Sequence, residues 1–265
     1  MGRPMSSAAT MGLHPLPERG WRAGLSPLMR AEFGAWWRTR EWWTQALLWT
    51  VVINGSVAVA VWGDAPEGLG VFGLYGVMTM FAAIAVAILM QETIVGEKRS
   101  GTAAWVLSKP ASRESFLLSK LIPNAVGVIA TMIAIPSAVL LVQTLLAGID
   151  VSVPRFALGT LVPALNLLFY LTLTLMLGTL FDSAGPVIAI PLAFAFGQQL
   201  IGGIPGLGSV LPWALVVGTG DSETSVTGAI ITGQPIPAPA ALVTTALACA
   251  VFVAVAFWKW RRTEL

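Results

Sequence analysis

Six stretches without a single Asp, Glu, Lys or Arg constrain this sequence more than any other feature. They cover residues 44–62, 69–91, 121–146, 156–181, 187–204 and 240–258. A helix needs about 20 apolar residues to cross the hydrocarbon core of a bilayer. Charged residues make up only 11% of the chain, whereas a soluble domain carries about 25%. The sequence therefore predicts an all-α membrane protein with six transmembrane helices, and it excludes the ordinary globular, disordered and fibrous classes.

The basic residues indicate how this six-span domain, 44–258, is oriented. Of the 15 Lys and Arg residues, 14 lie before the first stretch, between the second and third, or after the last, and Arg155 is the exception. Lys and Arg next to membrane spans stay in the cytoplasm. Both termini are therefore expected to be cytoplasmic, with 1–24 as a flexible tail and 259–265 as a second tail. Because the charges flank the spans in this way, nucleic acid is not expected as a partner.

An aromatic segment, 25–43, precedes the first stretch. At helical spacing, Met29 and Phe33 share one face with the first two tryptophans. This pattern is typical of an amphipathic helix that lies in the membrane interface, with indole rings at the depth of the lipid head groups. The residues expected to anchor the chain to membrane lipid are Phe33, Trp36, Trp37, Trp42 and Trp43. The alternative is that the tryptophans are only the aromatic belt at the mouth of the first span.

The loop between the second and third stretches contains a short apolar segment. Ser100 is placed to cap a short helix from about Gly101 to Leu107, and Ser112 to cap a second helix that leads into the third span. Residues 103–107, Ala-Ala-Trp-Val-Leu, are too apolar for a solvated connector. An exposed apolar segment rimmed by charges is typical of a partner surface. The alternative is that the segment folds back on the bundle or the bilayer.

The region between the fifth and sixth stretches is apolar without being long enough to span. Residues 212–217 read Pro-Trp-Ala-Leu-Val-Val. We expect a re-entrant outer region here, since a non-helical backbone at membrane depth must be sheltered by protein. Residues 218–234 are then expected to form a polar outer loop.

Residues that catalysis or metal binding would require are scarce. The chain has one cysteine, Cys249, in an apolar setting, and one histidine, His14, in the N-terminal tail. It contains no G-x-x-x-x-G-K-[ST] sequence, so ATP binding through a P-loop is not expected. We therefore expect no catalytic residue, metal or cofactor in this chain.

The six stretches contain no ionisable carboxylate, histidine or basic group, which bears on how transport would be driven. Ion-driven transporters generally place such groups at bilayer depth. A bundle without them is expected to take its energy from a partner. The neutral polar residues that are candidates for lining a pathway are Asn54, Asn166, Gln198 and Gln199. For any one of them, a hydrogen bond between helices is the more common role.

The loop after the second stretch also carries a run of residues in a family pattern. They are Gly96-Glu97, Ser100-Gly101-Thr102, Trp105-Val106-Leu107, Lys109-Pro110, Ser112-Arg113, Phe116 and Lys120. In this run the sequence resembles the membrane subunits of ABC-2-type ABC transporters. The resemblance implies that 25–43 is the elbow helix and that the loop holds a cytoplasmic coupling helix, which docks on an ATPase subunit. The residues implied to contact the ATPase subunit are Glu97, Ser100, Gly101, Thr102, Trp105 and Arg113.

The resemblance further implies two membrane subunits, as two copies or a paralogous pair, and two ATPase subunits that hold ATP and Mg. This chain would then be the permease subunit of an ATP-driven exporter in a bacterial or archaeal cytoplasmic membrane. The scarcity of charge along the spans favours an apolar or amphipathic cargo. Two alternatives stay open: a mechanical transducer that passes ATPase motion to an extracytoplasmic partner, and a stand-alone channel or ion-coupled carrier.

Overall fold

The computed structural model describes residues 20–63, 70–202, 204, 206–218 and 224–263. Most of the predicted N-terminal tail, with His14, lies outside the described residues. Of the described residues 83% are helical, and none of them lies in a strand. Six helical segments are long and apolar enough to cross a membrane. The prediction of an all-α protein with six membrane-spanning helices is therefore confirmed.

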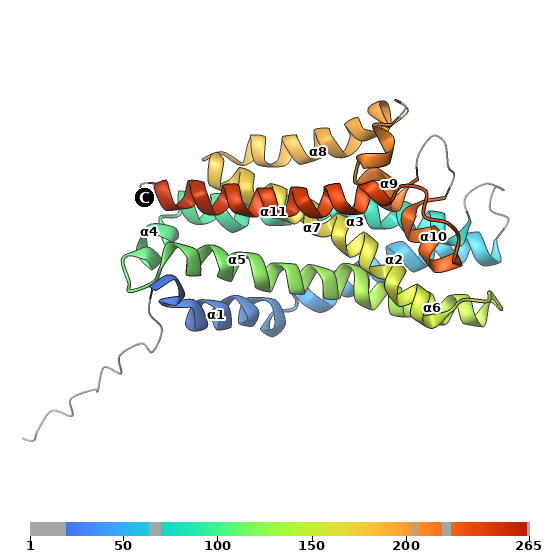
Figure 1. Ribbon diagram of the computed structural model, residues 1–265. Coiled ribbons are helices and arrows are strands. Elements are labelled where there is room, and N and C mark those ends of the chain that lie inside the picture. Colours follow the sequence, from blue (N-terminus) through green and yellow to red (C-terminus); the bar gives the residue numbers. More distant parts are fainter. Residues whose placement is uncertain (1–19, 64–69, 203, 205, 219–223, 264–265) are drawn as a thin grey trace, which may run out of the picture.

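The six spanning segments form one elongated bundle (Figure 1). Their bounds are α2 Glu41–Trp62, α3 Val71–Arg99, α5 Arg113–Val128 continuing through η2 Ile129–Ala134 into α6 Ile135–Leu146, α7 Val153–Leu180, α8 Ala184–Ile201 and α11 Pro239–Arg262. Several of them run past the predicted stretches: α3 continues beyond Gln91 to Arg99. The hydrocarbon layer excludes charged residues, but a helix can continue beyond that layer and carry charge there. The charge-free stretches therefore predict the part within the layer and underestimate the length of the helices.

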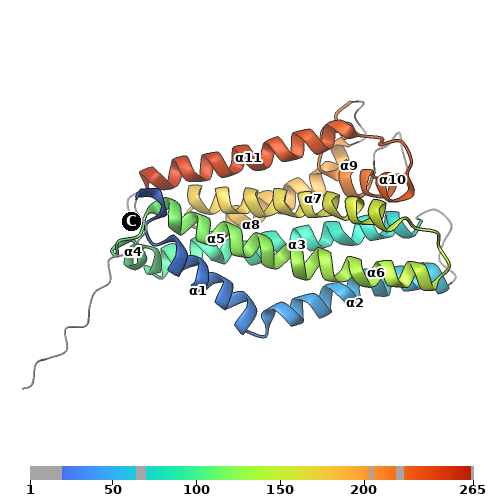
Figure 2. The ribbon, with the colours of Figure 1, turned by 60° about the horizontal axis from the view of Figure 1, so that its bottom comes forward.

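Helix α7 is the centre of the bundle. It lies between α11 and α5 in Figure 2 and packs most extensively against α3 and α11. In the most apolar 18-residue segment of α7, 78% of the residues are buried. The corresponding share is 17% in α11 and 22% in α8. The apolar faces of α8 and α11 are thus left outward, where only lipid or another protein can cover them.

The third spanning segment changes its pitch around Pro136. A proline in a helix lacks an N–H, and its ring crowds the carbonyl four residues earlier. The π-helical turn η2, Ile129–Ala134, widens the helix just before this position. Asn54 of α2 donates an amide hydrogen bond of 3.1 Å to the carbonyl oxygen of Pro136, so the polar span residue stabilises the contact between α2 and this irregular segment.

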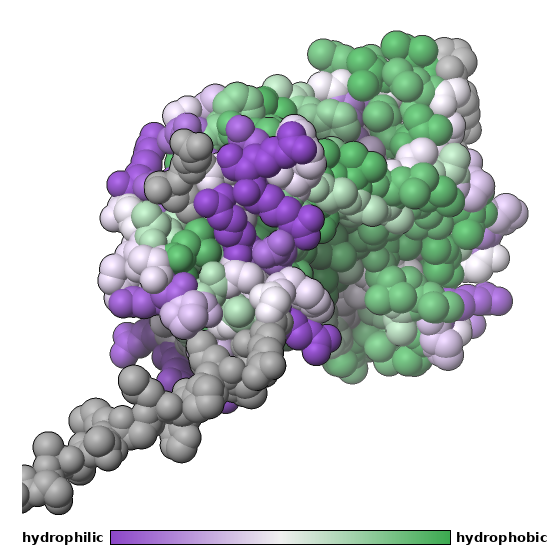
Figure 3. All heavy atoms as spheres, turned by 60° about the vertical axis from the view of Figure 1, so that its left-hand side comes forward, coloured by the Kyte–Doolittle hydropathy of each residue, from purple (hydrophilic) through white to green (hydrophobic). Residues whose placement is uncertain are grey.

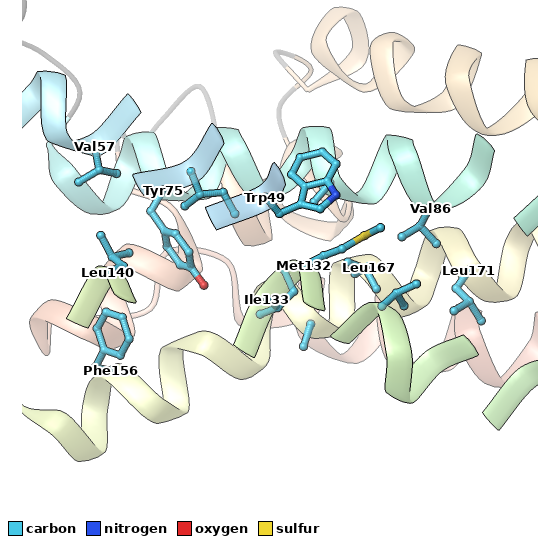
Figure 4. Packing of buried hydrophobic residues seen from close by; sticks show 14 of the residues in the cluster. Trp49, Val57, Tyr75, Val86, Met132, Ile133, Leu140, Phe156, Leu167 and Leu171 are labelled. Atoms are coloured by element: carbon cyan, nitrogen blue, oxygen red, sulfur yellow. The ribbon is translucent and has the colours of Figure 1, made fainter. Parts of the chain in front are cut away.

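The buried core beside this segment is built from α2, α3, α5–α6 and α7. Figure 4 shows Trp49, Tyr75, Met132 and Leu140 among its members. Tyr75 is fully buried, and its hydroxyl lies 2.7 Å from that of Ser137. Pairing the phenolic hydroxyl inside the core avoids the cost of an unsatisfied buried polar group, so this contact fixes the depth of α3 against α6.

Two short helices close the end of the bundle opposite the C-terminus. They are α9, Trp213–Val216, preceded by the 3-10 turn η3, Gly208–Val210, and α10, Val226–Thr232. Gly76 permits the close approach of α9 to α3, because a Cβ there would overlap the carbonyl oxygen of Val216. The polar outer loop predicted at 218–234 is wrong over α10, whose apolar residues are buried and whose start Ser225 caps. The Thr and Gly residues among the apolar residues of α10 made this segment look like a polar loop in the sequence.

Candidate functional site

The end of the bundle that holds the C-terminus carries most of the described charge. Figure 3 shows hydrophilic residues gathered on this end and hydrophobic residues along the adjoining sides. The helices that meet here are η1, Gly20–Arg22, α1, Leu25–Arg38, and α4, Thr102–Leu107, together with the start of α5 and the ends of α3, α7 and α11. We call this region the basic end. It contains the loop from which a partner contact is predicted.

Helix α4 is set off from α3 by a glycine. Gly101 has a positive φ of 73°, a left-handed conformation that L residues with a side chain adopt at a cost. The prediction that Ser100 caps this helix is wrong, because Ser100 is the C-cap of α3, Val71–Arg99, and Gly101 is the N-cap of α4. Ser112 caps α5 as predicted, since its hydroxyl accepts the N–H of Ser115 at 2.9 Å. The chain therefore turns sharply on both sides of α4.

Helix α4 presents one side to the bundle and one to the outside. Ala103 is buried in a cluster with Ile94 and Phe116. Trp105 is 64% exposed, and the ammonium group of Lys109 lies 5.1 Å from the centre of its ring. A groove of about 190 Å³ adjoins Trp105 and is lined further by Val106, Pro110 and residues at the start of α1. The segment thus rests on the bundle and still offers an apolar outer face.

Glu97 is turned inward. Lys120 of α5 is buried and forms ion pairs with Glu97 of α3 and with Glu32 of α1. A buried charge is tolerated when it is paired and hydrogen-bonded. These three residues therefore join three helices at the basic end, and the carboxylate that the resemblance assigns to an ATPase contact is occupied within the chain.

Arg113 also acts within the chain. Its guanidinium donates to the carbonyl oxygens of Trp260 at 3.0 Å and Arg261 at 3.2 Å, and to that of Thr263. The last carbonyls of a helix have no partner of their own and carry partial negative charge, so a cation there is stabilising. Arg113 consequently holds the end of α11 against the start of α5. Of the six predicted contact residues, Ser100, Thr102 and Trp105 remain exposed side chains.

Lys98 plays a similar part at the end of α7, and sequence reasoning missed it. Its ammonium group donates to the carbonyl oxygens of Thr179 and Phe181 at 3.2 and 3.3 Å and to the carboxylate of Asp182 at 3.0 Å. The side chain of Asp182 is 91% exposed and forms an ion pair with Lys98. The parallel ends of α3 and α7 explain the contact, and nothing in the local sequence signals it.

The tryptophans before the first span are divided between two environments. Trp36 lies against Gly127 of α5, and its indole N–H donates to Asn124 at 2.9 Å. Trp37 and Trp43 are exposed, and the ring of Trp37 lies 5.8 Å from that of Trp42. The common face expected from helical spacing is therefore split, and α1 ends at Arg38, so the last two tryptophans belong to α2.

The candidate pathway residues have separate roles. Gln198 is 2% exposed, donates to the hydroxyl of Tyr170 at 2.9 Å and accepts the N–H of Trp213 at 3.0 Å. It therefore joins α8 to α7 and α9. Asn54 contacts Pro136 as described, and Asn166 is buried in α7 with an amide nitrogen that has no partner among the described residues. Gln199 is exposed on the outer side of α8. The structure does not bring these four residues together.

Comparison with known proteins gives one family. The sequence model of a family described as "Protein of unknown function (DUF2705)" matches residues 57–265, from the middle of α2 to the end of the chain. No curated protein matches the sequence.

Proposed function

We propose that this chain, which belongs to the DUF2705 family of proteins of unknown function, is the permease subunit of an ATP-driven exporter of the ABC-2 type. In this proposal two ATPase subunits bind at the basic end, a second copy or a paralogue completes the membrane part, and the cargo is apolar or amphipathic. The chain itself would hold neither ATP nor Mg.

Helix α4 is the observation that carries the proposal. A six-residue apolar helix with an exposed tryptophan is costly to leave in water, since exposed apolar patches rimmed by charge usually bind a partner. It also packs through Ala103 on the last turns of α3 and the first turns of α5. A push on α4 would therefore reach two spanning helices directly, which is what a coupling helix must achieve.

The distribution of charge supports the proposed orientation. Arg99, Lys109 and Arg262 lie at the basic end, whereas Arg155 lies beside Gly233 at the other. By the positive-inside rule the basic end is cytoplasmic, so α1 would serve as the elbow helix. Helices α9 and α10, each too short to cross and both buried, would form the re-entrant outer region.

The outward faces of the bundle suggest where the other membrane subunit binds. Leu200 of α8 and Val243 and Leu247 of α11 are more than half exposed. Helices that keep apolar faces outward in a membrane associate through packing with another helix or remain covered by lipid. The second subunit would pack on part of this surface, and the pathway would form between the two copies.

Replacing Trp105 with glutamate tests the ATPase contact. We expect Trp105→Glu to remove an ATP-hydrolysing partner from the protein purified in mild detergent, because a charge would replace the apolar anchor of the contact. Helical content and membrane insertion should be unchanged, since the side chain is exposed. Trp37→Glu, at an exposed tryptophan away from α4, is the matched control. ATPase activity that co-purifies equally with wild type and Trp105→Glu would contradict the proposal.

A transport assay distinguishes export from mechanical transduction. In sealed inverted vesicles that contain the assembled complex, an exporter concentrates a lipophilic fluorescent cargo only when ATP is present. A transducer hydrolyses ATP without moving cargo. The isolated chain reconstituted alone should be inactive under an ion gradient, and activity there would instead identify a carrier.

A further inference from the structure

A cavity of about 370 Å³ lies between the helix before the first span and the bundle itself. Its walls come from α1, the start of α2, the C-terminal half of α3 and the last turns of α5. Helices α1 and α2 meet at an angle in Figure 2, and the cavity is lined by residues of both. The charge-free part of α2 begins at Thr44 and the cavity reaches from Glu41 to Gln45, so it opens at the boundary between the head groups and the hydrocarbon layer.

The polar part of the cavity wall consists of two carboxylates and three neutral polar side chains, those of Gln45, Thr93 and Asn124. Glu32 and Glu41 both line it, and none of the described residues that line it is basic. Glu32 has an ion-pair partner in Lys120, but this lysine is shared with Glu97, so two carboxylates face one buried cation. Glu41 makes no ion pair with the described residues. The neighbouring Arg38 and Arg40 are exposed and lie outside the lining. The wall therefore carries net negative charge.

Apart from these polar side chains, the wall is apolar or aromatic. Leu89, Met90 and Val128 form the side towards the bundle, and the indole of Trp36 forms another side. Trp36 cannot turn away easily, because its ring lies against Gly127 and its N–H is bonded to Asn124. A rigid aromatic wall next to carboxylates is a combination that binds organic cations, through charge-assisted hydrogen bonds and the face of the ring.

We propose that this cavity binds an organic ammonium group carried on an apolar body. The ammonium would donate to Glu41 and Glu32, and the apolar body would lie along Leu89, Met90 and Val128 towards the lipid. An anionic head group would meet two carboxylates, and a neutral one would leave the negative charge of the wall unbalanced. The inference is independent of the proposed exporter, since it requires binding and no ATPase partner.

The binding test uses octylamine, which is protonated at neutral pH, and 1-octanol, which has the same chain without the charge. Isothermal titration calorimetry of the full-length protein in neutral detergent should show saturable binding of octylamine and none of 1-octanol. Glu41→Gln should weaken octylamine binding about tenfold, as expected for loss of a charge-assisted hydrogen bond. Glu92→Gln, at an exposed glutamate of α3 outside the cavity, should bind as wild type does.

A steric pair of variants locates the site. Ala35 lines the cavity and is exposed, so Ala35→Phe should fill the space and abolish binding without disturbing a buried contact. Ala31 is exposed one turn earlier on α1 and does not line the cavity, so Ala31→Phe should leave binding intact. Both substitutions lie at exposed positions of α1. We therefore expect both variants to keep the circular dichroism spectrum and the oligomeric state of the wild type.

Two sources could supply the ammonium group, and native mass spectrometry distinguishes them. After reconstitution in equal parts of phosphatidylethanolamine and phosphatidylglycerol, retention of phosphatidylethanolamine by wild type and not by Ala35→Phe would identify a lipid head group. Octylamine binding without such retention would identify a freely diffusing amphiphile. Equal affinity for octylamine and 1-octanol, or binding that survives in both Ala35→Phe and Glu41→Gln, would overturn the proposal.

Discussion

The two ends of the bundle are held together by different chemistry. At the basic end, Lys98, Arg113 and Lys120 each reach from one helix to the backbone or carboxylates of another. At the opposite end the ties found among the described residues are neutral: Thr227 donates to the carbonyl oxygen of Leu215 at 2.7 Å, and Gln198 joins three helices. The first end is held by charge and the second by close packing with amide and hydroxyl groups.

This difference shows that the basic residues near the span ends have two roles, in the orientation of the chain and in its stability. A lysine or arginine near a span end indicates the cytoplasmic side, but three of those at the basic end also neutralise helix ends or buried carboxylates. The parallel C-terminal ends of α7 and α11 need such cations, because their last carbonyls have no helical partner. At the end with α9 and α10, short helices cover the bundle, and the contacts that the structure describes there are neutral.

The largest effect is expected from Lys120→Met. Removing the shared cation leaves Glu32 and Glu97 as uncompensated, partly buried charges, and breaking such a pair costs about 3–5 kcal/mol. The free energy of unfolding, measured by titration with dodecyl sulfate in mixed micelles, should fall by this order. Lys109→Met, at an exposed lysine of the same loop, should change it little. Equal effects of the two substitutions would show that the basic end is not held by its buried ion pairs.

At the opposite end, Gln198→Met is expected to cost about 1–3 kcal/mol, because the N–H of Trp213 would lose its acceptor in a partly buried setting. Gln199→Met should have no comparable effect, since that side chain is exposed. The same unfolding measurement decides between them. If Gln198→Met leaves stability unchanged and alters transport alone, Gln198 lines a pathway and the neutral end is held in some other way.

The six spans could be predicted because the hydrocarbon layer excludes charge from any sequence that crosses it. The cap at Ser112 was predictable for an equally local reason. The contacts of the basic end were not, because they join residues distant in sequence, such as Glu32 and Lys120, which are 88 positions apart. Helical spacing likewise placed Trp36 beside Trp37 and had no means to tell which indole faces α5. Glu97 and Arg113 were interpreted as partner contacts because a motif identifies residue types and leaves their direction undetermined.

The smallest effect is expected from Asp182→Asn, and it tests which contacts of Lys98 stabilise the basic end. Lys98 contacts the exposed carboxylate of Asp182 and also the carbonyl oxygens of Thr179, in the last turn of α7, and Phe181, just after it. An exposed ion pair contributes only about 0–1 kcal/mol, so Asp182→Asn should be nearly neutral in the unfolding titration. Lys98→Met should cost more, since it also leaves the carbonyl oxygens of Thr179 and Phe181 without a donor. Raising the salt concentration should reduce the effect of Asp182→Asn and leave that of Lys98→Met largely unchanged, because buried contacts are screened less. A cost for Asp182→Asn as large as that for Lys98→Met would mean that the basic end is stabilised by charge pairing at its surface, and that the helix ends need no cation there.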